Sequence, residues 1–475
     1  MRSKILVAAA VVALGFFAIA SSPALAAPGG GKGKGEAGKS SYGQLSPVIT
    51  GHETFAQMMS KDTAGKAGVI ARQKALLEMR YDLTRNVNAK VTMTRGKPIP
   101  VGPTVRLPKG MTFDLLAQMS PEDIRDKGLF PKGFLPLPHP NHPVGGMLFP
   151  QHQIKLEEMK RLERFDLDFD LPEHFLPEFP PAIFLTTRAD LGDVSQGKVV
   201  TLETFHEIFQ GILNPKDMEG MRLLVTQFPQ AQFNSTFDRK TVKPSQGVAC
   251  FDCHVNGHTS SATHLVGDIR PQEHRRRIDT PSLRGVNVQR LFGSQRSLKS
   301  IEDFTEFEQL AAYFDGDILA ATLKGINRLD RSTQVHFMSE VQNLLDFPPA
   351  PNLGLDGKLN PKKFAADSSE MKGQKLFFGK ARCAECHPAP YYTDNSMHNL
   401  KVERFYKAQT VNGMMATAQG PIKTFTLRGI KESPPYFHDG RLLTLEDTVE
   451  FFNLILETQL TTVEKRDLIA FLRQL

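Results

Sequence analysis

The sequence predicts a mainly α protein in which two related domains in tandem follow a loop-rich, Pro-rich N-terminal region. Three observations support this fold class. A sequence pattern that begins at Ser282 recurs at Thr426, an offset of 144 residues. Proline is dense between residues 47 and 215, and the chain ends in an amphipathic helical pattern. The length of 475 residues fits about three domains of roughly 150 residues each.

The composition is that of a globular chain with a small positive charge. Hydrophobic residues make up 40% and charged residues 23%, which excludes wholesale disorder and a collagen-like structure. The formal net charge is +7, and it falls to +5 without Arg2 and Lys4 of the leader described next. A charge of this size is too small to indicate a nucleic-acid partner.

Residues 1–26 form a predicted signal peptide, and residues 27–46, rich in Gly, Lys and Ser, a flexible linker. Two basic residues precede the apolar run 5–20, and Ala24-Leu25-Ala26 fits a small-residue cleavage site after Ala26. The alternative, a membrane anchor, would need about 20 apolar residues. We therefore expect a protein that is exported to a bacterial periplasm and has no stable membrane span.

Residues 47–215 form an N-terminal region of unknown role. Stretches such as His139–Pro143 and Leu171–Pro177 are rich in proline, which interrupts helices and is disfavoured in central strands. Loops are therefore expected here. The histidines of this region have no regular ligand spacing, so we interpret them as ordinary surface or packing residues.

The second half of the chain contains an internal duplication. Ser282-Leu283-Arg284-Gly285-Val286 recurs as Thr426-Leu427-Arg428-Gly429-Ile430. Ser300-Ile301-Glu302-Asp303 recurs at the same offset as Thr444-Leu445-Glu446-Asp447. Agreement at a constant offset, without gaps, indicates two copies of one domain.

A related start precedes each copy, Gly220-Met221-Arg222-Leu223-Leu224 in the first and Gly373-Gln374-Lys375-Leu376-Phe377 in the second. The duplication therefore predicts a first domain at 216–345, a Pro-rich linker at 346–364 and a second domain at 365–475.

The C-terminal residues predict a helix that packs on the core. Thr461 and Glu464 have the spacing of a capping box. Apolar residues then follow the helical period, with charged residues between them: Val463, Leu468, Ile469, Leu472 and Leu475.

Each copy contains one Cys-x-x-Cys-His motif, the attachment signature of c-type haem. Two thiols of this spacing form thioethers with one porphyrin, and the adjacent histidine ligates the iron. A zinc site would need further ligands at regular spacing, and a redox Cys-x-x-Cys would not require the histidine. Two small disulfides remain an alternative. The two motifs use every cysteine of the chain and predict two cytochrome c-type haem domains, with cofactor-binding residues Cys250, Cys253, His254, Cys383, Cys386 and His387.

The motifs and their flanks resemble the bacterial dihaem cytochrome c peroxidase and MauG family. The matching residues are Thr280–Gly285 in the first domain and Cys386-His387-Pro388, Tyr392–Asn395 and His398-Asn399 in the second. The most diagnostic segment is Pro435–Gly440, followed by Thr444–Glu446. The resemblance covers about half of the chain, from 216 to 475.

The resemblance implies two α-helical cytochrome c domains that face each other. His254 would be the proximal iron ligand of the reactive, peroxidatic haem, and His387 that of the haem that delivers electrons. It also implies hydrogen peroxide as substrate and a small redox donor, a cytochrome c or a cupredoxin. Calcium is a further candidate cofactor, and a homodimer a further candidate assembly.

This chain departs from the family in two ways that affect electron transfer. The family commonly has Trp at the place of Leu291–Ser294, between the haems, and this chain has no Trp. Coupling between the haems must therefore use another route or be slower. The second haem of the family often takes Met or Tyr from the helix after the His-Asp-Gly turn, where this chain has Val449–Asn453. We expect Met415, then Met397, as the sixth ligand, with core packing as the alternative.

A peroxidatic pocket needs a group that moves a proton between the peroxide oxygens. The resemblance implies a Glu after the first-domain turn, so Glu306 and Glu308 are the candidate catalytic residues, with a solvated helix position as the alternative. Other candidates are weaker, and each has a packing or surface alternative. They are His264, His274 and the pair His336 and Met338 as sixth ligands, and Arg275-Arg276-Arg277 as partners of the haem propionates.

Three functions therefore compete. The first is an exported dihaem peroxidase-type oxidoreductase, in which one haem reduces hydrogen peroxide with electrons delivered through the other. The second is a MauG-like oxidation of a protein or organic substrate by high-valent haem. The third is a dihaem electron-transfer cytochrome without catalysis, in which both irons have six ligands.

Overall fold

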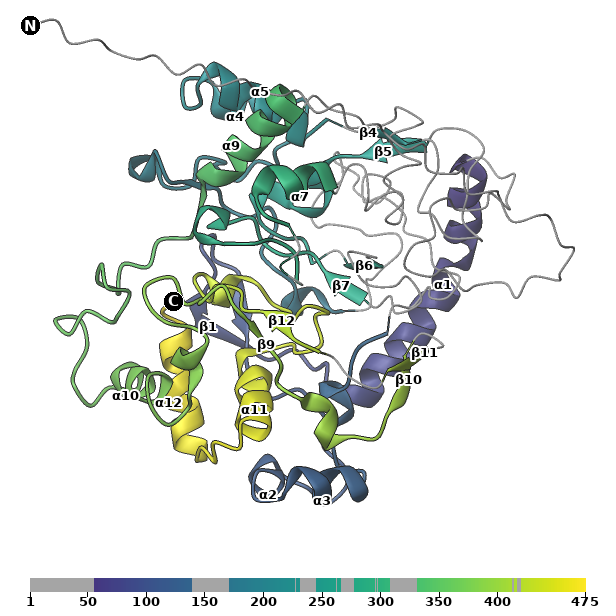
Figure 1. The fold of residues 1–475 in the computed structure, drawn as a ribbon, viewed down its shortest axis with the longest axis vertical. Helices are drawn as coiled ribbons and strands as arrows, with labels where there is room; N and C mark the ends of the chain where they lie inside the picture. Colours follow the sequence, from purple (N-terminus) through teal and green to yellow (C-terminus); the bar gives the residue numbers. More distant parts are fainter. Residues whose placement is uncertain are drawn as a thin grey trace, which may run out of the picture. The chain divides into compact units, whose positions relative to one another are not determined.

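The computed structural model describes residues 55–138, 171–226, 228–230, 245–261, 263–265, 277–294, 296, 298–307, 331–411, 414–416 and 420–475. The predicted signal peptide and the linker that follows it lie outside these residues. Gly38–Leu475 forms one compact unit that contains every described residue. The described part is rich in helices and has little sheet, as the sequence predicts (Figure 1).

The longest described helix, α1, belongs to the N-terminal region, and the others are short. The α-helices are α1 (Phe55–Arg80), α2 (Phe113–Leu116), α3 (Pro121–Asp126), α4 (Phe205–Phe209), α5 (Pro215–Leu224), α6 (Cys250–Cys253), α7 (Ile301–Phe307), α9 (His336–Leu344), α10 (Ser369–Phe377), α11 (Leu445–Ile455) and α12 (Thr462–Leu472). The π-helix η10 (Arg331–Val335) precedes α9. The 3-10 helices are η1 (Lys132–Phe134), η4 (Glu173–Phe175), η5 (Ala189–Leu191), η6 (Val255–Gly257), η8 (Val286–Val288), η11 (Cys383–Glu385), η12 (Val402–Phe405) and η13 (Ile430–Glu432).

The strands of the described residues form antiparallel pairs of two. The pairs are β1 (Val87–Thr92) with β2 (Pro98–Pro100), β3 (Phe184–Leu185) with β8 (Leu345–Asp346), β4 (Phe228–Gln230) with β5 (Ser245–Val248), β6 (Thr263–Leu265) with β7 (Arg277–Asp279), β9 (Met397–His398) with β12 (Ile422–Lys423), and β10 (Gln409–Val411) with β11 (Met414–Ala416). In the last pair Thr410 lies opposite Met415. No described helix has the length and apolar character that a membrane span requires.

The two sequence repeats have the same local geometry. Phe292 forms an isolated antiparallel bridge with Leu298, and Tyr436 forms the equivalent bridge with Leu442. The helix that follows begins in the same way in both copies. Ser300 Oγ accepts from the Asp303 amide at 3.1 Å before α7, and the side chain of Thr444 accepts from the Asp447 amide at 3.0 Å before α11. A hydroxyl that satisfies an amide of the first turn is the usual N-cap.

In each repeat, the first helix packs across the last one. Helix α5 contacts α9 in the first repeat, and α10 contacts α12 in the second (Figure 1). A glycine lies at each crossing, and a Cβ atom there would collide with backbone of the partner helix. The collisions are between Gly220 and the Phe337 carbonyl, and between Gly373 and the Asp467 carbonyl. The tight helix contact therefore explains why both related starts, Gly220–Leu224 and Gly373–Phe377, begin with glycine.

Helix α12 confirms the helix predicted at the C-terminus. Thr461 and Glu464 form the capping box, since the Thr461 side chain accepts from the Glu464 amide and the Glu464 carboxylate accepts from the Thr461 amide. Leu468, Ile469 and Leu472 are buried, and so is Leu475 beyond the helix end. The prediction for Val463 is wrong, because this residue of the first turn is 54% exposed.

The N-terminal region contributes to both hydrophobic cores of the described residues. One core joins apolar residues from the stretch Leu77–Leu176 to those of Leu359–Leu475. The other joins Ile183–Val225 to residues from Phe251 to Leu345. The region that precedes the repeats is thus packed into the same cores as the repeats.

Candidate functional site

The two Cys-x-x-Cys-His motifs fold into the same backbone turn. The amide of His254 donates to the carbonyl of Cys250 at 3.0 Å, and the amide of His387 donates to the carbonyl of Cys383 at 2.9 Å. Each turn closes over four residues and places two thiols and one imidazole on one loop. Among the described residues, which include all four cysteines, no disulfide forms. The disulfide alternative therefore finds no support in the structure.

The two motif histidines are oriented alike. The Nδ1 atom of His254 lies 2.8 Å from the carbonyl of Pro281, and that of His387 lies 2.8 Å from the carbonyl of Tyr392. A carbonyl only accepts, so Nδ1 carries the proton and Nε2 keeps its lone pair. This is the arrangement that a metal-ligating histidine has when its second nitrogen is held by a backbone carbonyl.

Both imidazoles are neutral at pH 7. Burial lowers the pKa of His254 to about 4, although the hydrogen bond to Pro281 acts in the opposite direction. Burial also lowers the pKa of His387. A neutral imidazole is the protonation state that binds a metal.

One cavity of about 490 Å³ is lined by both motif histidines. Its walls come from both repeats and are mainly apolar. The apolar lining includes Leu283, Val286, Phe292, Ile301 and Phe304 from the first repeat, and Leu427, Ile430, Tyr436, Phe437 and Phe452 from the second. A cavity of this size with few polar groups is typical of a site for a large organic ligand.

The residues present fit two c-type haems. Each motif offers two thiols for thioether bonds and a neutral imidazole with an available Nε2, and both imidazoles reach one apolar cavity. Gln289 gives a further indication, because it is buried, lines the cavity and has no hydrogen-bond partner for Oε1 among the described residues. An orphaned polar atom at a cavity wall indicates a ligand or water that satisfies it. Of the cysteines, Cys386 is among the lining residues.

A buried ion pair joins the two repeats beside this cavity. Arg284 of the first repeat pairs with Glu432 of the second at 2.9 Å, and both side chains are 5% exposed. The second carboxylate oxygen of Glu432 accepts from the amide of Thr94 at 3.0 Å. His258 also joins the repeats, since its Nδ1 lies 2.7 Å from Ser282 Oγ and its Nε2 lies 3.0 Å from the Glu432 carbonyl. Glu432 is thus the point where the N-terminal region and both repeats meet.

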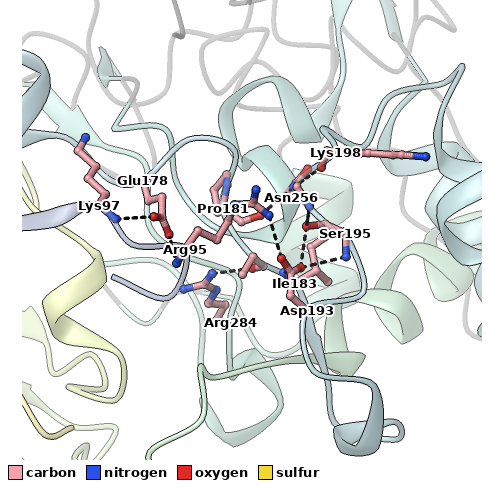
Figure 2. A network of polar contacts seen from close by, with 12 residues as sticks. Arg95, Lys97, Glu178, Pro181, Ile183, Asp193, Ser195, Lys198, Asn256 and Arg284 are labelled. Atoms are coloured by element: carbon pink, nitrogen blue, oxygen red, sulfur yellow. Dashed lines mark hydrogen bonds and ion pairs between the residues drawn. The ribbon is translucent and has the colours of Figure 1, made fainter. Parts of the chain in front are cut away.

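Figure 2 shows how the N-terminal region is attached to the loop of the first motif. Asn256, two residues after His254, is 1% exposed. Its Nδ2 donates to the carbonyls of Pro181 at 2.8 Å and Lys198 at 2.9 Å, and its Oδ1 accepts from the Val200 amide at 2.8 Å (Figure 2). One side chain therefore satisfies three backbone groups of the N-terminal region.

The N-terminal region also covers the His-Asp-Gly turn of the second repeat. Asp439 forms an ion pair with Arg441 at 2.8 Å, and neither side chain is exposed by more than 1%. The amide of Leu137 donates to Asp439 at 2.9 Å. Asp447 accepts from the amides of Thr104 at 2.7 Å and Val105 at 3.0 Å. These carboxylates are satisfied by backbone amides that lie more than 300 residues earlier in the chain.

The candidate catalytic and sixth-ligand residues differ in where the structure places them. Glu306 lies on α7, partly buried, but it is not among the described lining residues of the cavity. Glu308 lies outside the described residues. Met415 lies on β11 and its side chain is outside the described part. Met397 lies on β9 beside His398, a lining residue whose Nε2 is 2.7 Å from Asp394.

The weaker candidates are placed as follows. His264 lies on β6, and its side chain is outside the described part. His274, Arg275 and Arg276 lie outside the described residues, whereas Arg277 is buried on β7. His336 begins α9, is 42% exposed and lies 3.5 Å from both Glu302 and Glu340. Met338 is fully buried in the core of the first repeat.

Sequence reasoning assigned no role to several residues that the structure brings to the site. Asn256, Arg284 and Glu432 join the three parts of the chain, and Lys423 lines the cavity. The constant offset of the repeat could have drawn attention to Arg284, because it is one of the identical positions, but its partner is not local in sequence.

The chain was compared with known proteins, and no protein-family model matches it. Three curated relatives are a cytochrome-c peroxidase IdrP1 of Pseudomonas sp. (strain SCT), a methylamine utilization protein MauG of Methylorubrum extorquens and a cytochrome c551 peroxidase of Nitrosomonas europaea. They are 27%, 30% and 32% identical over 26%, 23% and 26% of this chain. The matches span 45%, 35% and 39% of the relatives, so the chain spans less than half the length of each.

Two solved structures are also similar, each at 20% sequence identity. One is a hydrazine synthase of Kuenenia stuttgartiensis, with a TM-score of 0.35 over 59% of this chain and 94% of that chain. The other is a MauG-like protein associated with microbial copper homeostasis, with a TM-score of 0.37 over 55% and 88%. Together with the two motifs, the sequence relatives confirm the resemblance to the bacterial dihaem cytochrome c peroxidase and MauG family.

Proposed function

We propose that this protein is an exported dihaem c-type oxidoreductase that reduces hydrogen peroxide at the His254 site with electrons delivered through the His387 site. The observation that carries the proposal is the matched pair of Cys-x-x-Cys-His turns, each with a neutral, carbonyl-held imidazole at one apolar cavity. The cytochrome c peroxidases among the relatives support this activity.

The bound haems would supply the redox chemistry, and the chain would supply position and exclusion of water. His254 and His387 would each present Nε2 to an iron, held in place by the carbonyls of Pro281 and Tyr392. The four motif cysteines would fix the cofactors covalently: Cys250, Cys253, Cys383 and Cys386.

Proton transfer and orientation of the ligand would be the tasks of different residues. Glu306 and Glu308 remain our candidates for moving the proton between the peroxide oxygens. Gln289 would hydrogen-bond a polar ligand in the cavity, because its Oε1 has no partner among the described residues and it lines the wall. Its amide cannot act as an acid or base, so its role would be to orient the ligand.

Electron paramagnetic resonance of the purified holoprotein tests the proposal. We expect a high-spin ferric signal that hydrogen peroxide removes, together with peroxide consumption when a reduced cytochrome c or cupredoxin is supplied. His254→Ala should abolish the reaction with peroxide, and His387→Ala should mainly abolish turnover with the donor. His206→Ala, at an exposed position of α4, is the matched control and should retain both.

The other outcomes separate the competing functions. Two low-spin signals that ignore peroxide in the ferric and half-reduced states would show an electron carrier and contradict the proposal. Reaction with peroxide but no turnover with any small donor would favour the MauG-like alternative. The MauG protein among the relatives supports this alternative. That alternative would then be tested by oxidation of a protein or organic substrate.

A further inference from the structure

A buried lysine lies at the junction of the two repeats and has no anionic partner among the described residues. Lys423 belongs to β12 in the second repeat and is 4% exposed. Its amide donates to the carbonyl of Ser294 in the first repeat at 3.0 Å, and its side chain lines the cavity. Lys423 therefore lies in a wall to which both repeats contribute.

The ammonium group of Lys423 contacts two aromatic rings. Nζ lies 5.4 Å from the ring centroid of Phe292 and 5.3 Å from that of Phe425. Phe292 is in the segment where the family commonly has Trp. Cation–π contacts of this kind contribute about 0.5–2 kcal/mol each. They offset only part of the cost of removing an ammonium from water, which is several kcal/mol without a counter-ion.

No described carboxylate or hydrogen-bond acceptor pairs with Lys423 Nζ. Its charged neighbour is another cation, Arg296, whose Nε is buried and has no partner among the described residues. Burial, together with the nearby charge of Arg296, lowers the pKa of Lys423 to about 8. The ammonium is still the main form at pH 7, so Lys423 makes this part of the cavity wall positive.

The cavity offers few anions of its own. Asp279 is the one carboxylate among its described lining residues, and the charged neighbour of Lys423 is Arg296 rather than this carboxylate. Two other lining cations have partners, since Arg284 pairs with Glu432 at 2.9 Å and Arg428 donates to the carbonyl of Leu475 at 3.1 Å. A c-type haem has two propionate carboxylates, and one of them would provide the anionic partner for Lys423.

We propose that Lys423 binds a propionate carboxylate of a haem held in this cavity and thereby raises the reduction potential of that haem. The inference rests on the haem binding proposed above. A positive charge close to a haem stabilises its reduced, less positive form, and the low dielectric of a buried site strengthens the effect. Lys423 would act as a positioning residue for the cofactor.

The test is a redox titration of the holoprotein with four variants. Lys423→Met and Lys423→Gln remove the charge, Lys423→Arg retains it, and Lys375→Met removes an equal charge from the exposed side of α10. We expect both neutral variants at Lys423 to shift the reduction equilibrium of one haem about tenfold toward the ferric form. This corresponds to 59 mV for a one-electron couple. Lys423→Arg and Lys375→Met should match the wild type.

Resonance Raman spectroscopy of the same samples identifies the anion. The propionate bending band should shift in Lys423→Met and Lys423→Gln and stay in place in the two other variants. A wild-type potential that depends on chloride concentration, with an unchanged propionate band in every variant, would assign the anion to solvent and overturn the inference. Reduction potentials and propionate bands equal to wild type in both neutral variants would also overturn the inference. If the wild type still contains two haems, that result leaves the proposed function intact. A wild type without haem would contradict the proposed function itself.

Discussion

At the level of single residues, the site contains two buried ion pairs. Arg284 and Glu432 are each 5% exposed, and Asp439 and Arg441 are almost completely inaccessible. A buried pair contributes little net stability compared with an apolar pair of the same shape, but removal of one partner leaves an uncompensated charge. Substitution of one partner should therefore lower the stability of the fold.

Arg284→Met should lower the free energy of unfolding by about 3–5 kcal/mol, because Glu432 would remain buried without its guanidinium. Arg188→Met breaks an ion pair with Asp190 in which the side chains are 36% and 65% exposed, and it should leave the free energy of unfolding close to the wild-type value. Denaturant unfolding of both variants provides the measurement. If both variants lost the same small amount of unfolding free energy, the buried pair would contribute no more to stability than the exposed pair.

The Asp439–Arg441 pair predicts a defined loss of stability in acid. Burial by itself would raise the pKa of Asp439, but the Arg441 guanidinium overcomes this and lowers the pKa to about 2. The folded pKa is below the ordinary value of 3.8, so the ionised carboxylate stabilises the fold above about pH 4 and this contribution is lost between about pH 4 and pH 2.

The expected contribution of this pair is about 2 kcal/mol. Unfolding free energies should be measured from pH 5 to pH 2 for the wild type and for Asp439→Asn/Arg441→Met, which removes both charges. The wild type should lose about 2 kcal/mol more than the double variant across this window. Parallel pH curves for the two proteins would contradict the assignment.

At the level of elements, the helix crossings that begin each repeat require glycine. A methyl group on Gly373 of α10 would collide with the Asp467 carbonyl of α12. Gly373→Ala should therefore destabilise the protein by about 1–3 kcal/mol, as overpacking of a tight contact does. Gly65 of α1 is the matched control, because a Cβ there meets nothing within 4 Å.

Gly65→Ala should stabilise the protein by about 0.5–1 kcal/mol, since alanine favours the helix and no contact opposes it. Thermal unfolding of the two variants gives opposite signs if the crossing is as tight as the structure shows. A stabilising effect of Gly373→Ala would exclude close approach of α10 and α12.

The loop after the first motif depends on Asn256, which satisfies three backbone groups of the N-terminal region. Its φ of 52° lies in the left-handed region, which asparagine tolerates better than alanine. Asn256→Ala should cost about 1–3 kcal/mol because the Val200 amide would be buried without an acceptor. Asn287→Ala, at an exposed position on η8, should change stability by less than about 0.5 kcal/mol.

Hydrogen exchange distinguishes this role from a general loss of stability. In Asn256→Ala, the amide of Val200 should exchange faster by a larger factor than the amides of α12. A uniform increase across both segments would mean that Asn256 does not attach the N-terminal region to the motif loop.

The local features of the fold could be predicted from the sequence, and the long-range ones could not. Thr461 and Glu464 are three residues apart, so their capping box is encoded in a single turn. The motif turns and the constant offset of the repeats are equally local patterns. By contrast, Arg284 and Glu432 are 148 residues apart, and Asp447 meets Thr104 across 343 residues. No periodicity in a single sequence specifies such partners.

At the level of the whole molecule, the N-terminal region is part of the site architecture. Its residues join both hydrophobic cores and satisfy buried polar groups of both repeats, among them Glu432, Asp439 and Asn256. The sequence indicated only a Pro-rich region without a motif. Its role became visible through contacts with residues far along the chain, and we interpret it as a support for the first motif loop and for the His-Asp-Gly turn of the second repeat.

The central claim is that each Cys-x-x-Cys-His turn holds one covalently attached haem. The most direct test is the intact mass and haem content of the protein purified from a host that matures c-type cytochromes. We predict the mass of the polypeptide plus two haem groups, and one haem fewer in Cys250→Ser/Cys253→Ser and in Cys383→Ser/Cys386→Ser. A colourless protein with the mass of the polypeptide alone would contradict the account.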